Sequence, residues 1–143
     1  MSTIERTVTT SAAPDTVFAY LADFENATEW DSGTVSCDKV SGDGGPGTVY
    51  KNVSKFAGNE VSLDYTVETV AQPVFVIVGR NDTTTSRDTI TVTPADGGGS
   101  NVHYKAEFTF TGIAKFLGPV MAPLLGRLGD KTAEKLKNSL DRL

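Results

Sequence analysis

The sequence predicts an α+β fold in which a large antiparallel sheet is followed by one long C-terminal helix. Of the 15 valines, 14 precede residue 117, whereas seven of the nine leucines lie at or after it. Branching at Cβ favours strands, and leucine loses little rotamer freedom in a helix. Apolar segments between residues 35 and 111 are separated by short turns, and such turns join antiparallel neighbours.

A chain of 143 residues is expected to form one domain, residues 1–143, around one substantial core. The net charge of -5 argues against a nucleic-acid partner, because phosphate binding needs clustered Lys and Arg. No apolar run approaches the roughly 18 residues of a membrane span, so stable membrane insertion is not expected. A lone cysteine, Cys37, and a start without signal-peptide character predict a cytoplasmic protein.

The first elements are one strand and two short helices. Residues 3–10 are rich in β-branched side chains and place Ile4 and Val8 on one face, which is typical of a half-buried strand. Pro14 suits a first helical turn, and Asp15 complements the helix dipole. The spacing of apolar residues after them predicts a short helix, and a second short helix is expected over residues 24–30.

Six further strands are expected, bounded by turn-forming Gly, Pro, Asn and Asp residues. Their predicted ranges are 35–41, 48–56, 59–70, 74–81, 85–94 and 101–111. The last strand alternates most clearly, with one face formed by Val102, Tyr104, Ala106, Phe108 and Phe110. One face of the sheet should therefore be buried and the other solvated.

The C-terminal segment predicts an amphipathic helix of about 20 to 25 residues. Its apolar stripe comprises Leu117, Met121, Leu124, Leu125, Leu128, Thr132, Leu136, Leu140 and Leu143. Pro119 can occupy a first-turn position, whereas Pro123 removes one helical hydrogen bond. We therefore expect either a start near Pro119 with a bend or a later start. A helix of this length should cross the whole sheet.

This order of elements resembles the START-like, or helix-grip, superfamily and its polyketide cyclase/dehydrase-like branch. Four motifs carry the resemblance: the opening helix Ala13-Pro14-Asp15-Thr-Val17-Phe18-Ala-Tyr-Leu21-Ala-Asp23, the aromatic Trp30, the Gly-rich hairpin from Gly42 to Tyr50, and the strand end Phe108-Thr-Phe110-Thr-Gly112. The resemblance implies a curved seven-stranded sheet that grips the C-terminal helix. It also implies a cavity between them for an apolar molecule such as a lipid or polyketide.

Large side chains that are expected to face inward are the candidate ligand-binding residues. They are Trp30, Tyr65, Val76, Tyr104, Phe108, Met121, Leu124 and Leu125. Tyr65 and Tyr104 carry polar tips on otherwise apolar strand faces, so each could orient a ligand oxygen or make a structural hydrogen bond. Arg6 shares the face of Ile4 and Val8 and could pair with an anionic ligand group or extend to the sheet edge.

The sequence gives little indication of catalysis and no motif for a cofactor or metal ion. There is no Gly-x-Ser-x-Gly or His-Glu-x-x-His motif, and one Cys with one His cannot supply a zinc site. His103 is expected on the solvated face of its strand and Cys37 as an inert thiol. If the protein is an enzyme, Tyr65, Tyr104 and Arg6 are the first catalytic candidates.

Three functions are consistent with the sequence. The first is binding, transport or sensing of a small hydrophobic ligand without a cofactor. The second is a polyketide cyclase, aromatase or dehydratase, in which the cavity folds a reactive chain. The third is a protein-interaction module whose core is filled by its own side chains. The sequence leaves the ligand and the oligomeric state undetermined.

Overall fold

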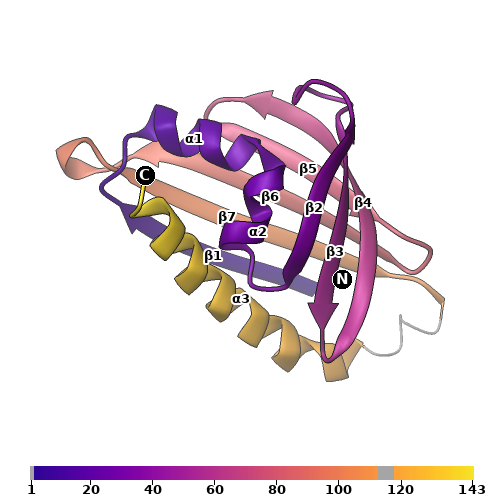
Figure 1. The fold of residues 1–143 in the computed structure, drawn as a ribbon. Helices are drawn as coiled ribbons and strands as arrows, with labels where there is room; N and C mark the ends of the chain where they lie inside the picture. The colour runs from indigo at the N-terminus through magenta and orange to yellow at the C-terminus, as the bar shows by residue number, and fades with distance from the viewer. Residues whose placement is uncertain (1, 113–117) are drawn as a thin grey trace.

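A computed structural model describes residues 2–112 and 118–143. It contains a seven-stranded antiparallel sheet, short helices after the first strand and a long C-terminal helix (Figure 1). The predicted α+β class, the strand number and the placement of the short helices are confirmed. Leu117 of the predicted helix stripe lies outside the described residues.

The first half of the chain forms one sheet edge, the helices and the opposite edge. Its elements are β1 (Ser2–Thr10), α1 (Pro14–Ala22), the 3-10 turn η1 (Phe24–Asn26), α2 (Ala27–Trp30), β2 (Thr34–Ser41) and β3 (Val49–Phe56). The second half consists of β4 (Asn59–Ala71), β5 (Val74–Arg80), β6 (Thr84–Pro94), the 3-10 turn η2 (Asp96–Gly98), β7 (Ser100–Phe110) and α3 (Gly118–Leu140).

The strands follow the order β1-β7-β6-β5-β4-β3-β2. Consecutive strands from β2 to β7 are neighbours, so the helices between β1 and β2 carry the chain across the sheet to its far edge. Register shifts interrupt the pairing of β2 with β3 and of β4 with β5, and such bulges increase strand bending and twist. The sheet curves around α1, α2 and α3 (Figure 1).

Helix α3 runs alongside β1 at one edge of the curved sheet and packs against β1 and α2 (Figure 1). Its 23 residues agree with the predicted length, and Pro123 is accommodated inside it. Gly129 allows α3 to lie close to β1, because a Cβ at this position would lie 2.7 Å from Cγ2 of Ile4. None of the described helices is long and apolar enough to cross a membrane.

Aromatic rings fill the space between the short helices and the sheet. Phe24 lies at the centre, with ring centroids 4.9 Å from Tyr65, 5.8 Å from Tyr50 and 6.1 Å from Trp30. The tilted and edge-on geometries are those that aromatic pairs prefer. This cluster closes one side of the concave face and leaves a cavity between itself, the sheet and α3.

Candidate functional site

The cavity has a volume of about 140 Å³ and lies between the concave face of the sheet, the end of α2 and the first half of α3. Most of its wall is apolar and comes from Ile4, Phe24, Trp30, Leu63, Phe108 and Leu125. Its polar wall includes Asp31, Asn52, Tyr65, Ser86, Asp88, Tyr104 and Thr132. A mainly apolar wall with a few polar groups is typical of a small-molecule site.

Six of the eight predicted ligand-binding residues line this cavity: Trp30, Tyr65, Tyr104, Phe108, Met121 and Leu125. The structure brings them together from α2, β4, β7 and α3. The alternation of β4 and β7 explains why Tyr65 and Tyr104 line the cavity, because both residues lie on the same strand faces as their buried apolar neighbours.

Val76 and Leu124 do not line the cavity. Val76 lies opposite Thr89 on β6, whereas the next residue, Ile77, lies opposite the cavity-lining Asp88. Successive strand residues point to opposite faces, so Val76 is buried on the other side of β5. Leu124 is half-buried in α3 beside Leu125, which takes the inward position.

Asp88 is the most unusual group in the cavity wall, because it is buried and its partners on the adjacent strands are the buried apolar residues Ile77 of β5 and Ala106 of β7. The Ser86 hydroxyl donates to Oδ1 at 2.7 Å, and the Tyr104 hydroxyl donates to Oδ2 at 3.3 Å. Burial raises the pKa of Asp88 from 3.8 to about 7, and the nearby Asp31 carboxyl adds to the shift. Both protonation states of Asp88 are therefore accessible near neutral pH.

The two tyrosines of the polar wall stay protonated. Burial raises the pKa of Tyr65 and of Tyr104 well above 10, and the carboxyls of Asp88 and Asp31 raise both further. Each phenol can therefore donate a hydrogen bond to an acceptor. The ring of Tyr104 meets Trp30 edge-on, with centroids 5.7 Å apart. The buried indole N–H of Trp30 has no hydrogen-bond partner among the described residues.

Asp31 supplies a second carboxyl from the turn after α2. Thr34 donates its hydroxyl to Oδ2 at 2.6 Å, and Thr132 of α3 donates to Oδ1 at 3.1 Å. Burial raises the pKa of Asp31, whereas the two hydroxyls and the nearby Lys135 ammonium oppose that shift. Asp31 therefore joins α3 to the turn before β2 and presents its carboxyl at the cavity wall.

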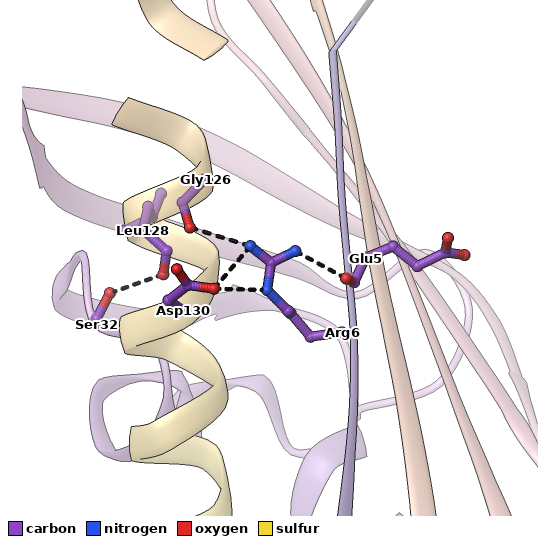
Figure 2. A network of polar contacts seen from close by, with 6 residues as sticks. All are labelled: Glu5, Arg6, Ser32, Gly126, Leu128 and Asp130. Carbon is purple, nitrogen blue, oxygen red and sulfur yellow. Dashed lines mark hydrogen bonds and ion pairs between the residues drawn. The ribbon is translucent and has the colours of Figure 1, made fainter. Parts of the chain in front are cut away.

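Arg6 is not part of the cavity wall. It extends from β1 to α3, where Nη2 lies 3.0 Å from Oδ1 of Asp130 and donates to the carbonyl of Gly126 at 3.1 Å (Figure 2). Nη1 donates to the backbone carbonyl of Glu5 at 2.8 Å. Figure 2 also shows Ser32 donating to the carbonyl of Leu128 on the same helix. These contacts give Arg6 a structural role in holding α3 against the edge strand.

His103 and Cys37 lie away from the cavity. The imidazole Nε2 of His103 lies 3.0 Å from the Glu5 carboxylate on the solvated face of β7 and β1, as the alternation predicts. Cys37 is buried, and burial raises the pKa of its thiol to about 12, so it remains protonated. Within residues 2–112 and 118–143, no three His, Cys, Asp or Glu side chains are grouped to hold a metal ion.

The polar half of the cavity wall, above all Asp88 and Asp31, is not predicted from the sequence. A local signal exists for Asp88. In β6 the residues Ser86, Asp88, Ile90 and Val92 share one face, and the buried Ile90 and Val92 identify it as the inner face. Asp31 has no such signal, because it lies in a turn and faces the cavity through contacts with residues that are distant in sequence.

Comparisons with known proteins agree with this architecture. The family model for "Polyketide cyclase / dehydrase and lipid transport" matches residues 1–141. A START superfamily protein from Mycobacterium smegmatis has a TM-score of 0.82 at 16% identity, over 99% of both chains. The Zhui aromatase/cyclase from Streptomyces sp. R1128 has a TM-score of 0.80 at 15% identity, over 98% of this chain and 93% of its own.

A protein from Thermus thermophilus has a TM-score of 0.78 at 18% identity, over 98% of this chain and 94% of its own. No curated protein matches the chain. At these identities the structural likeness concerns the fold, and the same fold can carry different functions. The chemistry must therefore be argued from the cavity itself.

Proposed function

Because the chain belongs to the polyketide cyclase/dehydrase and lipid transport family of START-like proteins, we propose that it binds a small hydrophobic molecule inside the cavity. The observation that carries the proposal is a cavity of about 140 Å³ with a largely aromatic and aliphatic wall. Apolar surface that leaves water on binding contributes about 25 cal/mol per Å². The proposal treats residues 1–143 as one ligand-binding domain.

The volume limits the size of the enclosed part of the ligand. An engineered apolar cavity of about 150 Å³ in another protein binds benzene. The cavity of about 140 Å³ therefore fits one six-membered ring or a chain segment of similar size. Tyr65, Tyr104 and Asp88 would orient a polar atom of the ligand, while the apolar wall would supply most of the affinity.

A titration calorimetry experiment with toluene and ethylbenzene tests this function. The wild-type protein should bind both, and Leu125→Trp should abolish binding by filling the cavity that Leu125 lines. Val40→Trp is the matched control, because it introduces the same side chain outside the cavity. Val40 lies on β2 and is 60% exposed. Circular dichroism would establish that both variants fold. No uptake of either ligand by the wild type would contradict the proposal and favour a protein-interaction module.

One observation favours a cyclase, aromatase or dehydratase as a second candidate. Asp88 combines burial in the cavity wall with a pKa of about 7, and a carboxyl with these properties can act as a general acid or base near neutral pH. Turnover of a polyketone that disappears in Asp88→Asn, with ligand binding retained, would support an enzyme. Turnover that survives this substitution would remove Asp88 from a catalytic role.

A cytoplasmic location is part of the proposal. It is supported by Cys37, the one cysteine of the sequence, which can form no disulfide within the chain. Localisation of a fluorescent fusion in the native host would test it, and export of the fusion would contradict it.

A further inference from the structure

The charged groups of the cavity wall are unbalanced. Asp31 and Asp88 both line the cavity, and their carboxyls are close enough for each to influence the same two tyrosines. Among the described lining residues the single basic side chain is Lys55, which is exposed on β3. The cavity wall therefore has two acids and, among the described residues, no buried base that would balance their charge.

The nearest other basic residues are engaged elsewhere. Arg6 contacts Asp130 and two backbone carbonyls. Lys135 donates to the backbone carbonyls of Thr28 and Asp31 at 3.2 and 3.3 Å, so it moderates the charge of Asp31 from outside the cavity. Asp88 receives hydrogen bonds from Ser86 and Tyr104 and has no ion pair among the described residues.

The remaining wall adds a second, independent feature. The rings of Phe24, Trp30, Tyr65 and Tyr104 all line the cavity beside the two carboxyls. The faces of aromatic rings carry negative charge density and attract cations, most strongly where water is excluded. An aromatic wall alone fits any apolar ligand, but an aromatic wall beside the buried Asp88 and the half-buried Asp31 favours a positively charged group over a negative one.

We propose that the preferred ligand of this cavity carries a basic nitrogen on a single-ring-sized apolar body, and that carboxylate ligands are excluded. The ammonium group lies near Asp88 and Asp31, and the apolar body fills the space along Leu63, Phe108 and Leu125. This inference rests on the proposed function, because it requires that the cavity accepts a ligand.

The physical basis is the cost of enclosing charge. A buried carboxylate without a counter-ion is expensive, whereas an enclosed pair of opposite charges recovers part of that cost. An ammonium group lets both acids ionise in the low-dielectric interior. A bound carboxylate would add a third acid to the same enclosure, so it would be repelled or would have to bind in its protonated form.

Titration calorimetry with benzylamine, benzyl alcohol and benzoate separates the three cases, because these compounds share one ring and differ in the polar group. We expect benzylamine to bind at least about tenfold more tightly than benzyl alcohol at about pH 8, where alkyl amines remain protonated. Benzoate should show no binding. Asp88→Asn should remove the preference for the amine, so that benzylamine and benzyl alcohol bind to the variant within about twofold of each other.

Asp82→Asn is the matched control, because Asp82 is exposed in the turn between β5 and β6. This substitution should leave the affinities for all three compounds unchanged. Equal or tighter binding of benzyl alcohol, or an amine preference that survives Asp88→Asn, would overturn the inference and leave the proposed function intact. Failure of all three compounds and of toluene would overturn both. If Asp88→Asn fails to fold, carboxyl NMR on the wild type decides, because bound benzylamine must lower the titration midpoint of Asp88.

Discussion

The ring of Tyr65 lies directly over Gly79, its partner on the adjacent strand β5. A Cβ at position 79 would be 2.7 to 2.8 Å from three atoms of the ring, which is closer than carbon atoms can approach without displacement. The absence of a side chain at Gly79 therefore sets the position of the Tyr65 ring. Because Tyr65 contacts Phe24 and lines the cavity, this strand pair fixes part of the cavity wall.

We predict that Gly79→Ala destabilises the protein by about 1 to 3 kcal/mol, which is the usual cost of overpacking a buried site. Urea unfolding would measure this change. In a Tyr65→Leu background the same substitution should cost much less, because the ring that it displaces is gone. Equal costs in the two backgrounds would show that the contact between Gly79 and Tyr65 does not limit packing.

Two glycines of α3 should respond to alanine with opposite signs. Beyond the backbone of α3 itself, a Cβ at Gly126 meets no atom of the described residues within 4 Å, so Gly126→Ala should stabilise the helix by up to about 1 kcal/mol. At Gly129 a Cβ would lie 2.7 Å from Ile4 and 3.0 Å from the Arg6 guanidinium. Gly129→Ala should therefore separate α3 from β1 and lower the free energy of unfolding by about 1 to 3 kcal/mol. Changes of the same sign would contradict this packing.

The raised pKa of Asp88 predicts a pH-dependent stability. Between pH 3.8 and about 7 the folded chain retains a proton on Asp88 that the unfolded chain has lost, so stability falls as the pH rises. At about 1.4 kcal/mol per pKa unit, the full loss is up to about 4 kcal/mol. Tyr65, Tyr104 and Asp31 face this carboxyl, and none of them supplies a compensating positive charge.

Asp88→Asn should remove this contribution. The stability difference between Asp88→Asn and wild type, measured by urea unfolding at several pH values, should grow in favour of the variant from pH 3.8 to about 7 and then stay constant. Taking the difference between the two proteins removes the contribution of Asp31. Its raised pKa makes stability fall with rising pH in both of them. A difference that does not change with pH would show that Asp88 ionises normally.

Arg6 should matter for stability and not for ligand binding. Arg6→Ala removes the contacts with Asp130 and Gly126, and we expect a loss of about 1 kcal/mol with ligand affinity unchanged within about twofold. Arg87→Ala is the control, because the exposed pair between Arg87 and Glu68 should contribute less. A selective loss of ligand affinity in Arg6→Ala would restore Arg6 as a functional residue.

The fold was predictable because its signals are local. The sequence predicts strands over residues 59–70 and 85–94, and the structure has Asn59–Ala71 and Thr84–Pro94. The alternation of buried and exposed residues identifies both strands, and turn-forming residues mark where each strand ends. The C-terminal helix was likewise predictable from its apolar stripe, and its extent over Gly118–Leu140 matches the expected length.

The site was only partly predictable, for two physical reasons. In Val74–Val78 both strand faces are apolar, so the sequence could not show that Val76 points away from the cavity. The volume that remains after packing depends on how α3 approaches the sheet at Gly129, and no local pattern contains that distance. The polar contacts of Asp31 with Thr132 likewise join residues 101 positions apart.

The most direct test of the account is a methyl NMR titration of the protein with toluene. If the cavity is the ligand site, saturable shifts should centre on the methyl groups of Ile4, Leu63, Met121 and Leu125, which line it. The exposed Val35 and Val40 on β2 should stay unchanged. Shifts that never saturate, or that centre on Val35 and Val40, would contradict the claim that this protein encloses a small hydrophobic ligand.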